Sequence, residues 1–173
     1  MATKNTKFTF RIKRIDILGS EYLLRPGLGT DHNFTFEFST EHGVISETGG
    51  VYSIIIAIVV KVFTEPEKKT RVAKIGVQFA YDIESSGIRK SRKGYHIPMK
   101  GYLGPMNIAI GTTRGIMFDK LLGTFLEHVY LPIMSPEDIL KKICEDGFVV
   151  LKHVKPDLES KKRVVSPRKK KKS

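Results

Sequence analysis

The chain opens with two stretches in which apolar and polar side chains alternate. Residues 7–18, KFTFRIKRIDIL, alternate in this way and change phase near Arg14. Alternation with a period of two is typical of a β-strand with one buried face, and the change of phase indicates a bulge. Residues 33–40, NFTFEFST, place three phenylalanines on one face and polar side chains on the other. These patterns predict two strands.

The next two strands differ in how much of their surface is apolar. Residues 51–63, VYSIIIAIVVKVF, are apolar in both alternating sets, which predicts a strand covered on both faces. A second subunit is expected on the face that the chain's own helices leave open. Residues 71–85, RVAKIGVQFAYDIES, have one apolar and one mostly polar face. The polar segment between these strands, residues 64–70, contains Pro66 and predicts a hairpin turn.

A helix is predicted after a long connection. Residues 84–104 are basic and have no regular apolar period, so they predict a loop. From Pro105, apolar residues recur at steps of three and four, which predicts a helix through Tyr130. Ser135 is placed to cap a short helix that begins at Pro136. Four strands followed by a long and a short helix, without βαβ alternation, predict an α+β fold with a four-stranded antiparallel sheet.

Length and charge predict one domain with a tail. A chain of 173 residues suffices for one buried core, which we assign to residues 1–155. Residues 161–173 hold eight Lys and Arg and no acid; subtracting these eight from the formal net charge of +12 leaves +4 for the rest. Because like charges repel and few apolar side chains are present, residues 156–173 are expected to form a disordered basic tail.

Two basic clusters make nucleic acid a candidate partner. The tail has the charge density for binding by counterion release, although a solvated tail is an equal interpretation. The second cluster comprises Arg89, Lys90, Arg92 and Lys93, and it precedes Tyr95. Aromatic side chains beside cations can stack on bases, but the same mixture also suits an ordinary loop. Both interpretations stay open.

The sequence predicts no enzyme activity, no metal site and no cofactor. Its five histidines lack metal-ligand spacing, and the single cysteine, Cys144, cannot form an internal disulfide or a structural zinc site. Residues 111–115, GTTRG, lack the Lys and Ser or Thr that follow the second glycine of a phosphate-binding loop, so a packing role is expected for these glycines.

The apolar run is too short for a membrane helix. Residues 54–60 are apolar and Lys61 follows, whereas a span needs about 20 apolar residues. The first residues, MATKNTKFTFRIKR, have no apolar core of a signal peptide. We therefore expect a cytoplasmic protein without a membrane span.

Three segments resemble the SecB family of export chaperones. They are FRIKRIDIL (10–18), the pair VYSIIIAIVVKV and VAKIGVQFAYDIE, and MNIAIGTTRGIMFDKLLGTFLEHVYLPIMSPEDIL (106–140). The last is the most specific, with an Arg in the helix, a Gly-Thr-Phe step, a Leu-Pro exit and an acidic short helix. The resemblance covers about residues 8–140. It implies a four-stranded antiparallel sheet in each subunit, sheets paired into dimers and helix-mediated stacking of dimers into a homotetramer.

The resemblance also implies a function, that of an ATP-independent chaperone, or holdase, which binds unfolded or nascent polypeptides and takes part in protein export. An unfolded chain exposes apolar segments that its native state hides, so that an apolar groove selects the unfolded form. By resemblance, the expected client-binding residues are Tyr22, Leu23, Leu24, Phe34, Phe36, Tyr95, Met99, Tyr102 and Leu103. The expected oligomer interface comprises Ile54, Ile56, Ile58, Phe118, Leu122 and Phe125.

The charges of this chain differ from those of family members that act in export. Family members that dock the SecA motor use an acidic sheet surface, and Asp16 matches one of its positions. Glu21 lies beside the second position, and Lys74 stands where an acid is expected. A SecA-like motor remains one candidate partner, and an antitoxin of a toxin–antitoxin pair suits these charges better. A nucleic-acid-binding module that uses residues 89–93 and the basic tail is the rival function.

Overall fold

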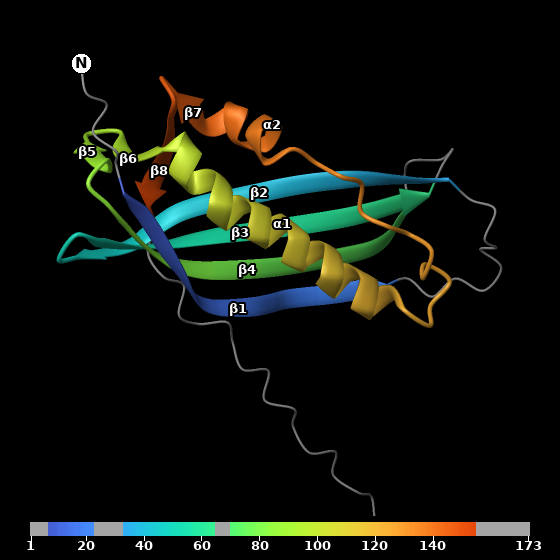
Figure 1. Ribbon diagram of the computed structural model, residues 1–173. Helices are drawn as coiled ribbons and strands as arrows, with labels where there is room; N and C mark the ends of the chain where they lie inside the picture. The colour runs from blue at the N-terminus through green and yellow to red at the C-terminus, as the bar shows by residue number, and fades with distance from the viewer. Residues whose placement is uncertain (1–6, 23–32, 65–69, 155–173) are drawn as a thin grey trace, which may run out of the picture.

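The computed structural model describes residues 7–22, 33–64 and 70–154, which form a sheet with one long helix lying across one of its faces (Figure 1). The predicted disordered tail, residues 156–173, lies outside the described residues. In chain order the elements are β1 (Phe8–Tyr22), β2 (Phe34–Thr48), β3 (Val51–Thr64), β4 (Arg71–Ser85), β5 (Arg89–Ser91), β6 (Gly94–Pro98), α1 (Met99–Leu121), α2 (Pro136–Leu140), the 3₁₀ turn η1 (Lys141–Ile143), β7 (Cys144–Glu145) and β8 (Phe148–His153).

The strands form a mixed sheet, and the predicted fold class is therefore wrong. The structure has an eight-stranded sheet in the order β1-β4-β3-β2-β8-β6-β5, with β7 paired to β8, instead of four antiparallel strands. β2 and β8 pair in parallel, Gly43 with Lys152 and Val44 with His153. The added strands have two to six residues each. Strands this short show no clear period, and β6 depends on pairing with β8, about 50 residues away in the sequence.

The four long strands include the residues at which the alternating pattern predicts strands, but β1 and β2 extend beyond the predicted ends at residues 18 and 40, to Tyr22 and Thr48. β1 pairs with β4, and its register shifts between Ile12 and Arg14, as the change of phase near Arg14 predicts. β3 lies between β2 and β4 and pairs with both in antiparallel fashion. β1 occupies the edge of the sheet, and no described strand pairs with its outer side.

The long helix starts and ends earlier than the predicted 105–130. It begins at Met99, whose backbone N–H donates to the carbonyl of Gly147 at 3.0 Å, and Pro105 lies inside it. It ends at Leu121 because Gly123 adopts a φ of +74°, a left-handed conformation that terminates helices. The apolar residues beyond Gly123 belong to residues 124–135, a segment of turns and irregular structure that runs back along the sheet and that we call the returning segment (Figure 1). Leu126 and Leu131 of this segment are buried.

The core lies between α1 and one face of the sheet. Ile54 and Ile56 of β3 and Phe79 and Tyr81 of β4 are fully buried there. The Tyr81 hydroxyl donates a 3.0 Å hydrogen bond to the carbonyl of Pro105 in α1. Both α1 and the returning segment lie on this face (Figure 1). The part of the chain that the structure describes contains no helix with the length and apolar character needed to cross a membrane.

Two glycines let α1 approach the edge strand. A Cβ atom on Gly101 would clash with the ring of Phe8, and one on Gly104 would lie 2.8 Å from the ring of Phe10. Hydrogen in place of a side chain therefore brings the first turns of α1 against β1. Further along β1, the side chains of Ile12, Ile15 and Ile17 are exposed.

Candidate functional site

The predicted client-binding residues do not form one cluster. Tyr22 ends β1 and Phe34 and Phe36 begin β2, at one end of the long strands; Met99 and Leu103 lie at the opposite end, in the first turns of α1 (Figure 1). All five side chains are half-buried. The predicted residues Leu23 and Leu24 lie outside the described residues. The client-binding role of this set stays a prediction, and the structure divides it into two groups.

Two further predicted client-binding residues are buried. Tyr95 is 7% exposed and Tyr102 is fully buried. The Tyr102 hydroxyl lies 3.0 Å from Nδ1 of His42, so that it links α1 to β2. Burial lowers the pKa of His42 to about 4, and burial, with a smaller effect of Tyr81, raises the pKa of Tyr102. In this chain, these two tyrosines are core side chains.

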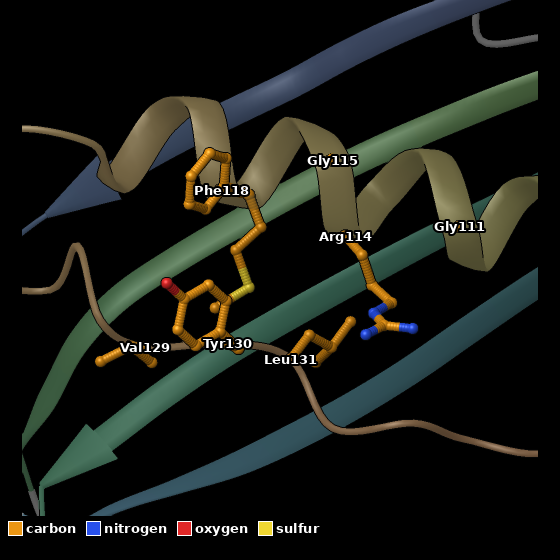
Figure 2. Close-up of a pocket in the computed structure, with 8 residues that line it drawn as sticks. Gly111, Arg114, Gly115, Phe118, Val129, Tyr130 and Leu131 are labelled. Carbon is orange, nitrogen blue, oxygen red and sulfur yellow. The ribbon is translucent and has the colours of Figure 1, made fainter.

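A groove separates α1 from the returning segment (Figure 2). Gly111, Arg114, Gly115 and Phe118 line it on the helix side, above the buried Met117. Val129, Tyr130 and Leu131 line the opposite side. Its volume of about 370 Å³ falls in the range of small ligand-binding pockets.

Exposed aromatic rings form one end of the groove. Phe118 and Tyr130 stack at a centroid distance of 6.0 Å with their planes 15° apart. They are 45% and 61% exposed, which is unusual for large apolar rings held in a fixed pair. The sequence pattern does not predict this groove, although the two glycines of GTTRG line its helix side. No atom lies within 4 Å of a Cβ placed on Gly111 or Gly115, apart from atoms of their chain neighbours and of the nearby helix backbone.

The helix side of β1 is a second accessible apolar surface. Ile15 and Ile17 pair in register with Phe79 and Val77, which belong to the buried face of β4. Ile12 pairs with Tyr81 in the same way. These isoleucines are nonetheless 40–48% exposed. We call Ile12, Ile15 and Ile17 the β1 isoleucine row.

The predicted interface residues fall into two groups. Ile54, Ile56 and Ile58 are fully buried beneath α1. Phe118 and Leu122 are exposed, and Phe125 is half-buried. The oligomer interface stays a prediction, but only the second group is accessible to another subunit in the described structure.

The acids predicted to dock a motor form ion pairs within the chain. Asp16 lies 2.6 Å from Arg14, and Glu21 lies 2.8 Å from Arg71. Lys74 is adjacent to Glu21 in the register of β1 and β4. Motor docking stays a prediction, and a docking partner would have to compete with these intramolecular cations.

A buried acid lies on the face of the sheet turned away from α1. Asp82 is 9% exposed, accepts a 2.6 Å hydrogen bond from the Ser53 hydroxyl and lies 3.1 Å from Arg11 and 3.4 Å from Lys13. Burial opposes ionisation, but the hydrogen bonds from Ser53 and Arg11 and the charge of Lys13 lower the pKa of Asp82 overall. Asp82 thus joins three strands and serves the fold.

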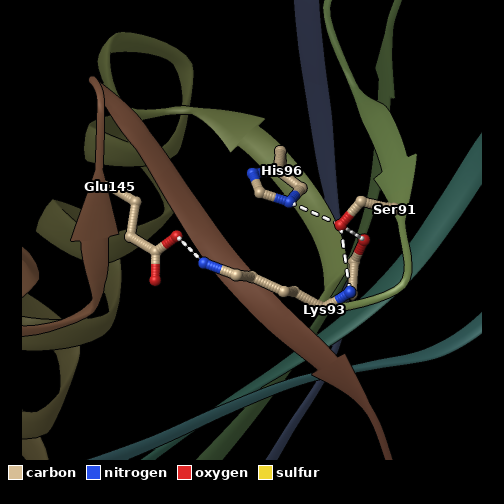
Figure 3. Close-up of polar contacts among 5 residues, drawn as sticks. Ser91, Lys93, His96 and Glu145 are labelled. Carbon is tan, nitrogen blue, oxygen red and sulfur yellow. Dashed lines mark hydrogen bonds and ion pairs between the residues drawn. The ribbon is translucent and has the colours of Figure 1, made fainter.

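The basic cluster at residues 89–93 forms the β5–β6 hairpin (Figure 3). Lys93 lies 3.1 Å from Glu145, and Lys90 lies 3.2 Å from Glu47. The Arg89 guanidinium lies 5.1 Å from the centre of the Phe148 ring. Three of the four cations thus contact groups of the same chain, and nucleic-acid binding by this cluster stays a prediction.

A serine and a histidine face each other in the same hairpin. The Ser91 hydroxyl lies 2.8 Å from Nε2 of His96 and accepts a hydrogen bond from the backbone N–H of Lys93 (Figure 3). The ring of His96 meets the edge of Phe148. These contacts fix the shape of a short, exposed turn.

Comparisons with known proteins give a structural likeness. No family model and no curated protein matches the sequence. Among solved structures, the chain is similar to a SecB-like chaperone of Mycobacterium tuberculosis in complex with a peptide from an antitoxin, with 14% sequence identity and a TM-score of 0.48. The match covers 72% of this chain and 90% of that chain.

Proposed function

We propose that the protein is an ATP-independent, SecB-like chaperone of the cytoplasm that holds non-native polypeptides, with a role in export as one form of this function. The observation that most directly supports this proposal is the apolar surface that the fold leaves accessible on both β1 and α1. The large apolar side chains that are at least one-third exposed are Phe10, Ile12, Ile15, Ile17, Leu18, Ile108, Phe118, Leu122, Tyr130 and Ile133. Several of them are neighbours in the fold, which favours a binding surface.

The physical basis is selection of unfolded chains by their exposed apolar segments. Each segment that docks removes apolar area from water, at about 25 cal/mol per Å² before the cost of ordering the segment. Several weak contacts on one molecule raise the overall affinity through effective concentration. Such binding needs no nucleotide, because a client leaves when it folds and hides the segments.

Assembly into a homo-oligomer, as a dimer of dimers, is part of this proposal. The outer edge of β1 has unpaired backbone groups within the described structure, and the β1 isoleucine row lies beside it. A long edge strand with exposed apolar side chains favours pairing with another strand. A second copy of β1 would continue the sheet and cover the row.

For a partner beyond the clients, we propose an antitoxin in preference to a SecA-like motor. The ion pairs of Asp16 with Arg14 and of Glu21 with Arg71 neutralise the acids that a motor would use. With a formal net charge of +12, the chain favours partners with acidic surfaces.

Suppression of aggregation tests the proposed function. A model protein is unfolded by heat or dilution from denaturant, and light scattering is followed with a few-fold molar excess of the full chain. We expect suppression that is equal with and without ATP. Unchanged aggregation of the model protein would contradict the proposal.

A further inference from the structure

The groove between α1 and the returning segment has a chemistry that the proposed function does not specify. We propose that it binds a segment of an unfolded polypeptide in which a large apolar side chain neighbours an Asp or Glu, with Arg114 pairing the carboxylate. This inference rests on the proposed function, because it names the class of client segment that one surface of the chaperone takes.

The apolar part of the segment has a place in the groove. Phe118 and Tyr130 form the stacked wall at one end, and Val129 and Leu131 line the side opposite α1. A cavity of about 370 Å³ accommodates a large aliphatic or aromatic side chain together with part of its backbone. A contact with these rings costs little conformational entropy on the side of the protein, because the rings are already held in place.

Arg114 supplies the charge recognition. Its side chain extends from α1 toward Leu131, into the space between the helix and the returning segment (Figure 2). No acid is among the residues that line the groove, and no ion pair is found for Arg114 within the described residues. A guanidinium beside apolar walls suits a carboxylate, which it can bind with two parallel hydrogen bonds.

The same surface is less suited to a second copy of α1. Gly111 and Gly115 would permit close approach of two helices, but a two-fold interface centred on them repeats every side chain on both partners. It would therefore bring two Arg114 side chains together without an acid from the groove lining to pair them. Burying like charges in this way is costly, whereas an acidic client segment neutralises the single cation.

The two glycines allow a test that spares the core. Gly115→Leu fills the groove from a position with open space around it, and the helix gains propensity from the loss of glycine. Asn107→Leu, exposed on the same helix outside the groove lining, is the matched control for added bulk. Arg114→Gln removes the charge alone, with Lys100→Gln as its control on the same helix. Thermal unfolding of each variant reports the fold.

Binding is measured by fluorescence anisotropy with two labelled peptides, one containing Leu-Asp-Phe and one containing Leu-Asn-Phe in the same flanks. We expect the full-length protein to bind the Asp peptide two- to fivefold more tightly, the scale of an exposed ion pair. Arg114→Gln should abolish this preference, and Gly115→Leu should weaken both peptides at least tenfold. Asn107→Leu and Lys100→Gln should bind as the unmodified chain does.

Three results would overturn the inference. They are equal binding of the two peptides by the unmodified chain, unchanged binding by Gly115→Leu, and a fall in oligomer mass of Gly115→Leu with peptide binding retained. The last would assign the groove to a second copy of the chain. Failure of the unmodified chain to suppress aggregation would instead count against the proposed function, so that the two failures are distinguishable.

Discussion

At the scale of single residues, the His42–Tyr102 pair connects β2 to α1 inside the core. The ring of His42 is neutral at physiological pH, because burial lowers its pKa to about 4 from an ordinary value of 6.5. Its Nε2 atom is buried and has no hydrogen-bond partner among the described residues. Protonation of His42 would place a charge in this apolar setting, so that the fold depends on the neutral ring.

We therefore predict that His42 makes the fold sensitive to mild acid. Its folded pKa lies below its unfolded pKa, so its contribution to stability is present above pH 6.5 and is lost as the pH falls toward 4. Between pH 7.5 and 4.5 the free energy of unfolding should fall by about 2 kcal/mol more in the unmodified chain than in His42→Gln. Urea unfolding at both pH values measures this difference; equal losses in the two proteins would refute it.

At the scale of elements, α1 carries glycines with opposite roles. Gly101 accommodates the ring of Phe8 beneath the first turns, whereas Gly115 faces the open groove. The helix therefore packs closely against β1 at its start and leaves space on its outer surface further along. Gly123, with its positive φ, then reverses the chain and positions the segment that forms the other side of the groove.

Matched alanine substitutions should separate these roles. Gly101→Ala should destabilise the protein by about 1–3 kcal/mol, because its Cβ would overlap the Phe8 ring. Gly115→Ala should stabilise it by up to about 1 kcal/mol, because alanine favours the helix and meets no neighbour. The unfolding midpoint in urea, measured for both variants, should move in opposite directions. Movement in the same direction would contradict the described packing.

The long strands are the part of the fold that the sequence predicts. β1 to β4 have 14 or 15 residues each, enough for alternation to be read directly. The sequence predicts a loop at residues 84–104, where the structure has β5, β6 and the start of α1. The five-residue β6 depends on pairing with the distant β8, which local spacing does not show. The groove was missed for a similar reason. It forms only where the returning segment lies beside α1, and this juxtaposition leaves no trace in local spacing.

At the scale of the whole molecule, one face of the long strands is covered unevenly. α1 buries the centre of β3 and β4 and leaves the β1 isoleucine row exposed at the edge of the sheet. The predicted interface residues Ile54, Ile56 and Ile58 are buried within one chain, whereas the β1 isoleucine row is accessible to a second subunit. The exposed edge of β1 and the β1 isoleucine row together favour assembly of subunits edge to edge.

Charges in the row should weaken this assembly. We predict that the double variant Ile15→Lys and Ile17→Lys has a lower mass than the unmodified chain, because two ammonium groups in each subunit would oppose burial of the row. Thr9→Lys, on the other side of β1, is the matched control for an added charge on this strand. Size-exclusion chromatography with light scattering measures the mass. An equal mass for all three proteins would contradict a β1 interface.

The most direct test of the account compares one client in two states. A disulfide-bonded protein is offered to the full chain in its native form and in a reduced, carboxymethylated form that cannot fold, and both affinities are measured by titration calorimetry. Because accessible apolar surface should select exposed apolar segments, we predict binding of the unfolded form and none of the native form. Equal binding of both forms, or binding of neither, would contradict the account.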